Sequence, residues 1–239
     1  MINLLQKHIF FNDKNIVSIK LLKNQGYCNK NYIVTVNNNK YIVRKLLRND
    51  IDRELEWRVL GLVYLQDITA KPLFYDKVHS FMIFEFLEGR HKRVLNMDDI
   101  TLLAYSLKKL HSIIIDNKPI RIEIENQNSE LIEALKVIEK YPNEYRLCHN
   151  DLNPENIIFN KGVKVIDFEY AGVNDRYFDL ASVCIEFKLD IEMQKVFLDA
   201  YFKSTNYSME KLRVYKVIYR ELCNEWFQKL IGGVSILHL

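Results

Sequence analysis

The stretch HNDLNPEN at residues 149–156, followed by VIDFE at residues 165–169, decides the fold of this chain. Asp151 lies in a predicted tight loop, Asn156 begins a short predicted strand, and Asp167 ends the next strand. A hairpin of these two strands brings one carboxylate and one amide oxygen to a single point. Hard oxygen ligands of this kind suit Mg²⁺. The sequence therefore predicts a magnesium site at Asn156 and Asp167.

The residue expected to do the chemistry is Asp151. Its predicted place across from the metal lets its carboxylate accept the proton of an attacking hydroxyl. The spacing HxDxxxxN with a later Asp-Phe resembles that of eukaryotic-like kinases. The continuation from Ile166 to Ala181, which includes Asp179, resembles the signature of the choline/ethanolamine kinases within the aminoglycoside phosphotransferase superfamily. That resemblance implies ATP and Mg²⁺ as cofactors, and we expect Asp179 to brace the Asp151 loop.

Hydrophobic periodicity divides the chain into a β-rich part and an α-rich part. Residues 32–36 and 41–46 alternate as strands around an Asn-rich turn, residues 81–86 form another buried strand, and residues 51–65 form a helix. After Gly89 the pattern becomes helical, with expected helices over 102–110, 128–141 and most of 178–230. We therefore predict an α+β, bilobal fold, and the family resemblance implies that this fold is protein-kinase-like. The expected lobes are a nucleotide-binding N-terminal lobe, residues 1–87, and a catalytic and acceptor-binding C-terminal lobe, residues 88–239.

The nucleotide contacts are expected in the N-terminal part. The loop QGYCNKNY at residues 25–32, which contains Gly26 and Asn29, resembles the loop between the first two strands of bacterial choline kinases, and its backbone N–H groups are expected over the ATP phosphates. The resemblance favours Arg44 as the phosphate-binding cation, with Lys45 on the opposite strand face as the alternative.

A helix carboxylate is expected to orient that cation. Glu54 fits best and Glu56 is the alternative. The segment MIFEFLEG at residues 82–89 resembles a hinge strand, whose backbone near Glu85 and Leu87 is expected to hydrogen-bond adenine.

The acceptor is expected to be a small molecule. Asp167-Phe168 is followed by Glu169 rather than by Gly, and the helix containing Asp179 begins about ten residues later, which leaves no room for a peptide-binding platform. A quaternary ammonium is held by aromatic faces and nearby carboxylates. The residues expected to form this pocket, on the family resemblance, are Tyr170, Glu186 and Trp226. Choline is the expected acceptor, with ethanolamine, thiamine or an aminoglycoside as alternatives.

Composition limits the other readings. The 239 residues carry a net charge of +3, which is too small to indicate nucleic-acid binding. Four scattered cysteines are expected as reduced thiols, and the absence of a long apolar run predicts a cytoplasmic protein without membrane insertion. A catalytically inactive nucleotide-binding module would lack the catalytic Asp or a metal ligand. Here Asp151, Asn156 and Asp167 are all present.

Overall fold

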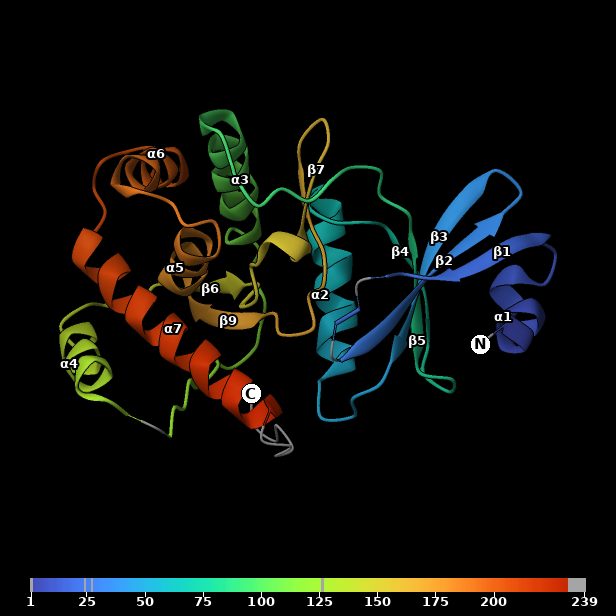
Figure 1. Cartoon of the computed structure of the whole chain (residues 1–239), viewed down its shortest axis with the longest axis horizontal. Helices are drawn as coiled ribbons and strands as arrows, with labels where there is room; N and C mark the ends of the chain where they lie inside the picture. Colours follow the sequence, from blue (N-terminus) through green and yellow to red (C-terminus); the bar gives the residue numbers. More distant parts are fainter. Residues whose placement is uncertain (1, 24, 27, 126, 232–239) are drawn as a thin grey trace. The chain divides into compact units, whose positions relative to one another are not determined.

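The computed structural model describes residues 2–23, 25–26, 28–125 and 127–231, and it divides into two compact units, residues 1–88 and 89–239. Each unit has its own helices and strands (Figure 1). Among the described residues, no helix combines the length and the apolar composition that crossing a membrane requires.

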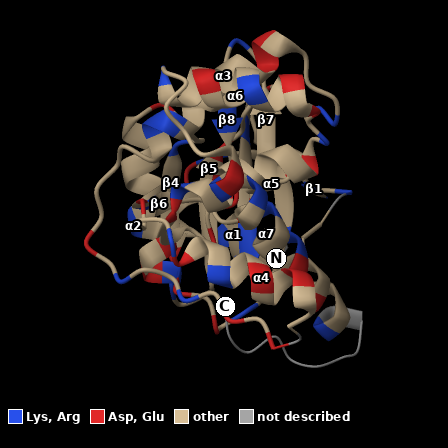
Figure 2. Ribbon diagram, turned by 90° about the vertical axis from the view of Figure 1, so that its left-hand side faces the viewer, with Lys and Arg blue, Asp and Glu red and all other residues tan. Residues whose placement is uncertain are grey.

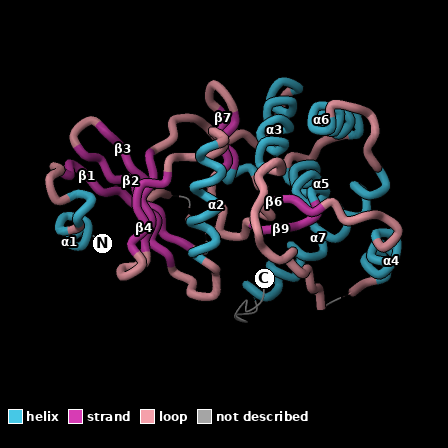
Figure 3. Tube along the Cα trace, turned by 180° about the vertical axis from the view of Figure 1, so that it is seen from behind, coloured by secondary structure: helices cyan, strands magenta, loops and turns pink. Residues whose placement is uncertain are grey.

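The first unit is built on a five-stranded antiparallel sheet. The strand order is β1-β2-β3-β5-β4. Figure 3 shows α1 and α2 on opposite sides of this sheet. The side chains of Leu5 and Phe11 pack on one sheet face against Val34, Val43 and Ile83, all nearly inaccessible to solvent. The elements are α1 (Ile2–Lys7), a 3₁₀ turn (Ile9–Phe11), β1 (Ile16–Leu21), β2 (Asn29–Val36), β3 (Asn39–Leu46), α2 (Arg53–Leu65), β4 (Pro72–Asp76) and β5 (Phe81–Glu85).

Local sequence explains two of these boundaries. Asn37, in the turn between β2 and β3, has a φ of 51°, which is a left-handed conformation that Asn tolerates better than most residues. Asp52 precedes α2, and its side chain accepts a hydrogen bond from the Leu55 N–H at 2.9 Å. This cap satisfies one of the free N–H groups of the first helical turn.

The second unit combines helices with two small antiparallel sheets of two strands each. β6 pairs with β9, and β7 pairs with β8. Helix α5 packs against α7, and α3 packs against α6 (Figure 1). The elements are α3 (Met97–Leu110), α4 (Ser129–Ile138), β6 (Tyr145–Cys148), a 3₁₀ turn (Pro154–Asn156), β7 (Ile157–Phe159), β8 (Val163–Val165), β9 (Gly172–Asp175), α5 (Arg176–Glu186), α6 (Ile191–Phe202) and α7 (Met209–Ile231).

A buried lysine fixes the start of α7. The ammonium of Lys211 donates to the Pro142 carbonyl at 2.8 Å and pairs with Asp175 at 2.7 Å and Glu144 at 3.1 Å. It also lies 4.7 Å from the centroid of the Tyr177 ring. Because this side chain is almost fully buried, its charge depends on these oxygen partners for compensation.

The expected α+β class is confirmed, and so are the strands and helices named above, with boundaries shifted by a few residues. The sequence did not predict β1, β4, β6, β9 or α1. All four cysteines are free thiols, as expected. Acidic and basic residues are interspersed along the ribbon without one dominant sign, in keeping with the small net charge (Figure 2).

Candidate active site

The backbone of the loop around Asp151 is held by Asp179. The two carboxylate oxygens of Asp179, in the first turn of α5, accept hydrogen bonds from the His149 N–H at 2.8 Å and the Asn150 N–H at 2.9 Å. Asn150 takes a left-handed conformation, with a φ of 67°. Its side chain donates to the Tyr170 carbonyl at 2.9 Å. The expected bracing role of Asp179 is thus confirmed.

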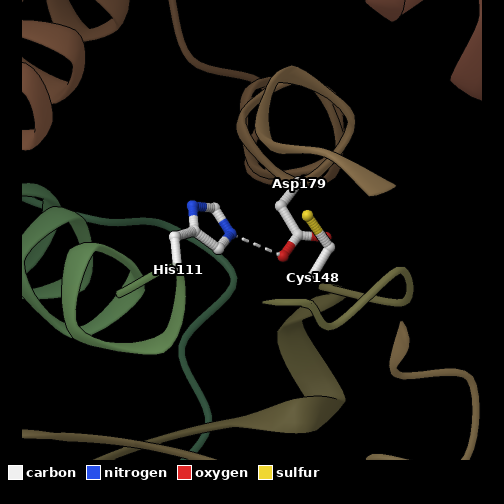
Figure 4. Close-up of side chains that lie close together, drawn as sticks. All are labelled: His111, Cys148 and Asp179. Atoms are coloured by element: carbon white, nitrogen blue, oxygen red, sulfur yellow. Dashed lines mark hydrogen bonds and ion pairs between the residues drawn. The ribbon is translucent and has the colours of Figure 1, made fainter. Parts of the chain in front are cut away.

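Asp179 is supported in turn by His111, which caps the end of α3. One ring nitrogen of His111 lies 3.0 Å from Asp179 and the other 2.6 Å from the Tyr201 hydroxyl. Cys148 completes a buried group of three possible metal ligands, drawn in Figure 4. Both His111 nitrogens and both Asp179 oxygens already have hydrogen-bond partners, and burial holds the pKa of Cys148 well above its usual value. His111 therefore acts as a brace for Asp179.

Two asparagines orient the Asp151 carboxylate. Asn153 donates to one oxygen at 3.0 Å, and Asn156 donates to the other at 2.8 Å and to the Asp151 carbonyl at 2.9 Å. Burial, and then the negative charge of Asp167, raise the pKa of Asp151 to about 7. A carboxylate that is held in place and has a raised proton affinity is suited to accept a proton.

The β7–β8 hairpin brings Asn156 and Asp167 into the same region. The Ile166 N–H donates to the Asn156 carbonyl at 2.9 Å, next to the end of the ladder between the two strands. The imidazole of His149, which accepts from the Asp151 N–H at 3.2 Å, donates its other N–H to the Ile166 carbonyl at 2.9 Å. Asp167 itself has a φ of 68°. A left-handed conformation at a residue other than Gly is a feature that clusters at functional sites.

The donor set at Asn156 and Asp167 fits a magnesium ion. The side-chain nitrogen of Asn156 donates to Asp151, so the side-chain oxygen of Asn156 is the atom that can face a cation. Asp167 supplies carboxylate oxygens. Mg²⁺ is usually bound through one or two such oxygens, with waters and phosphate oxygens as its other ligands.

In the first unit, Arg44 pairs with Glu56, and the expectation that Glu54 orients Arg44 is wrong. The Arg44 guanidinium donates to Glu56 at 3.0 Å, and both side chains are buried. Glu54 instead forms an exposed pair with Lys77 at 2.7 Å. The physical reason is helical spacing: Glu56 shares the buried face of α2 with Val59, Leu60 and Val63, at i, i+3, i+4 and i+7.

The same buried network reaches the loop before β2. Arg53, one helical turn before Glu56, donates to Glu56 at 2.7 Å and to the Asn29 side-chain oxygen at 3.2 Å. Sequence analysis missed Arg53, although its i, i+3 spacing to Glu56 was a signal. Lys45, the alternative to Arg44, donates to the His79 carbonyl at the surface, at 2.5 Å. Arg44 is therefore the strand cation that meets the helix carboxylate.

The other predicted nucleotide residues lie at loop and strand ends. A side chain at Gly26 would meet no atom of the described chain within 4 Å, so the loop is open at that position. Tyr27, in the same loop, lies outside the described residues. Glu85 ends β5 and its N–H donates to the Lys71 carbonyl at 3.1 Å, while Leu87 follows the strand by two residues.

The predicted acceptor residues lie on α5, on α7 and in the loop after Asp167. The Tyr219 hydroxyl on α7 donates to Glu186, the last residue of α5, at 2.9 Å. Burial comes first among the causes that raise the pKa of Cys223 to about 11, and the charges of Glu186 and Asp151 act in the same direction. The surroundings of the Cys223 thiol are therefore negatively charged.

Trp226 and Tyr170 are the remaining predicted acceptor residues. Tyr219, Cys223 and Trp226 follow one another at i, i+4 and i+7, so they share one face of α7. The Trp226 ring is half-buried and lies edge-on to Phe227, with the centroids 5.2 Å apart. Tyr170 contributes its carbonyl to the hydrogen bond with Asn150. Direct contact of either residue with an acceptor stays a prediction.

Comparison with known proteins defines the class. Residues 116–215, which contain the Asp151 loop, the β7–β8 hairpin and α5, match the phosphotransferase enzyme family, APH. The structure of choline kinase LicA from Streptococcus pneumoniae has the same fold, with a TM-score of 0.81 over 99% of this chain and 93% of that one, at 21% identity. The chain is thus a small-molecule phosphotransferase with a kinase-like fold.

Two sequence relatives support the same resemblance. The chain is 27% identical to a LicA homologue of Mycoplasma capricolum over 180 residues, which is 69% of this chain and 74% of that protein. It is 39% identical to a probable ethanolamine kinase of Dictyostelium discoideum over 101 residues, which is 36% of this chain and only 23% of that protein. These similarities agree with the sequence resemblance to the choline/ethanolamine kinases.

Proposed function

We propose that the chain transfers the γ-phosphoryl group of ATP to the hydroxyl of a small cationic alcohol, with choline as the preferred acceptor. The observation that carries the proposal is the arrangement at Asp151: a carboxylate oriented by two asparagines, with Asp167 and Asn156 beside it. In the proposed step the acceptor oxygen bonds to the γ-phosphorus and the bond from that phosphorus to the bridging oxygen of ADP breaks. Asp151 accepts the hydroxyl proton.

Asp167 and Asn156 would hold Mg²⁺, which when bound neutralises charge on the transferring phosphoryl group. Asn156 at the same time orients Asp151 through its amide N–H group. In the first unit, Arg44 would contact the phosphates, with its guanidinium held by Glu56. Gly26, Asn29, Glu85 and Leu87 keep their predicted roles toward the phosphates and the adenine.

The acceptor assignment rests on charge and on aromatic character. The Asp151 and Glu186 carboxylates both act on the thiol of Cys223, so the region around them is acidic. Within the described residues Glu186 pairs with the Tyr219 hydroxyl and with no cation, which favours a positively charged acceptor. Trp226, on the same face of α7 as Tyr219, would supply the aromatic surface that a quaternary ammonium prefers.

A coupled assay of ADP release tests the proposal. The wild-type protein is incubated with ATP and Mg²⁺ and with choline, ethanolamine, thiamine or an aminoglycoside, and Asp167→Ala serves as the inactive control. We expect choline to give the highest kcat/KM, ADP release to require Mg²⁺, and Asp167→Ala to be inactive. Turnover of another acceptor without choline turnover would refute the choline assignment alone. The absence of turnover with every acceptor would count against the phosphoryl transfer itself.

A further inference from the structure

One side chain in the first unit replaces a hydrogen bond of the sheet where β1 and β2 diverge. The last paired residues of these strands are Leu21 and Tyr32. The next pair is Leu22 with Asn31, and the Leu22 N–H donates to the Asn31 carbonyl at 2.9 Å. Such a pair in an antiparallel ladder normally exchanges two bonds, so Asn31 N–H would donate to the Leu22 carbonyl. Here it does not.

The side-chain carboxamide of Gln25 lies between the Leu22 carbonyl and the Asn31 N–H. Its nitrogen donates to the Leu22 carbonyl at 2.5 Å and to the Asn31 carbonyl at 3.2 Å. Its oxygen accepts from the Asn31 N–H at 2.7 Å. The side-chain amide thus satisfies both backbone groups that the strands leave unpaired, as a peptide group would. The ladder ends at this point and the chain leaves the sheet in a defined direction.

The other end of the same loop is anchored to different elements. The Cys28 carbonyl accepts from the Leu47 N–H at 3.1 Å, just after β3. The Asn29 side chain accepts from Arg53, which belongs to the buried network with Glu56. Gly26 lies between the two anchors, at a position that borders open space. Among the described residues, Gln25 therefore attaches the loop to the end of the β1–β2 ladder.

We infer that Gln25 is a positioning residue that shapes the loop for the phosphates of the nucleotide. This inference rests on the proposed function, because it takes ATP as the phosphoryl donor. Backbone N–H groups bind a phosphate well only when the loop already has the required shape, since otherwise binding must also order the loop. Gln25 acts through the loop backbone, and its own amide is committed to Leu22 and Asn31.

The donor and acceptor pattern makes glutamine specific for this position. Gln25→Glu keeps the size of the side chain and the acceptor for the Asn31 N–H, but it directs an oxygen at the Leu22 carbonyl in place of an N–H donor. Gln25→Leu removes all three hydrogen bonds and leaves two backbone groups without their partner. Gln66, an exposed residue at the end of α2, offers a matched control because Gln66→Glu makes the same change of charge in the same unit.

Titration calorimetry with two ligands tests this role. The affinities of Mg·ATP and of adenosine, which has no phosphates, are measured for the wild type, for both Gln25 variants and for Gln66→Glu. We expect Gln25→Glu and Gln25→Leu to bind ATP about tenfold more weakly, which corresponds to about 1.4 kcal/mol. The affinity of both Gln25 variants for adenosine should stay within about twofold of wild type. The control Gln66→Glu should bind both ATP and adenosine within about twofold of wild type.

The possible outcomes separate this inference from the proposed function. If wild-type protein binds no ATP, the proposed donor is wrong and the inference is wrong with it. If wild type binds ATP and the Gln25 variants bind it equally well, only the inference is overturned. A parallel loss of ATP and adenosine affinity would show a general structural role for Gln25 and would also overturn the positioning role.

Discussion

The Asp151 loop and the α7 face that carries Tyr219 and Trp226 differ in the kind of contact that places their side chains. The loop is held by hydrogen bonds to Asp179 and from Asn153 and Asn156, all within 30 residues in sequence. On the α7 face, helical spacing aligns Tyr219 with Trp226, and the Tyr219 hydroxyl donates to Glu186. We infer that phosphoryl transfer depends on the orientation of one carboxylate, whereas acceptor choice depends on the surface that one helix face presents.

The largest effect on turnover is expected from a substitution in the Asp151 loop. Asp151→Asn keeps an oxygen near its asparagine partners but removes the group that accepts the proton. Turnover should fall by about 10²–10⁴-fold, while ATP affinity and the melting temperature stay close to wild type. Steady-state kinetics together with nucleotide titration measure both quantities. Turnover within about threefold of wild type would exclude Asp151 as the base and remove the basis of the comparison.

A smaller effect is expected on the α7 face. Trp226→Ala removes an aromatic surface, and a cation–π contact contributes about 0.5–2 kcal/mol. The KM for choline should therefore rise by up to about thirtyfold, with the KM for ATP unchanged. Phe227→Ala, which removes a mostly exposed neighbouring ring, is the matched control. Equal KM values for choline in wild type and Trp226→Ala would place the acceptor elsewhere.

The smallest effect in this series concerns the two glutamates of α2. Glu56→Gln removes the charge between two buried arginines, and the KM for ATP should rise by about tenfold as Arg44 loses its orientation, an effect of about 1.4 kcal/mol. Glu54→Gln removes only an exposed pair, which typically contributes about 0–1 kcal/mol, so its KM should stay within twofold. ADP-release kinetics at varied ATP measure this difference. Equal KM values for the two variants would show that the buried pair does not serve the nucleotide.

The sequence predicted best those parts of the site whose residues lie close together in the chain. Asp151, Asn156 and Asp167 lie within 17 residues, and one hairpin is enough to bring them together, so their spacing alone predicted the arrangement. Asp179 was also predicted, because its helix follows directly.

Contacts between distant residues were harder to predict. Arg44 has carboxylates at two nearby positions in α2, and only the buried face of the folded helix distinguishes Glu56 from Glu54. His111 joins Asp179 across 68 residues, and no local pattern in the sequence indicates that contact. Strands β1 and β4 were missed because the burial along them does not alternate regularly.

The buried ammonium of Lys211 has a consequence for chemical labelling. Amine-reactive reagents modify a lysine only when it is deprotonated and accessible, and Lys211 is enclosed by Asp175, Glu144 and the Tyr177 ring. Surface lysines such as Lys77 should react quickly, whereas Lys211 should react only when the start of α7 separates from its neighbours. The rate at which this one lysine becomes labelled therefore reports how often the start of α7 separates from the rest of the second unit.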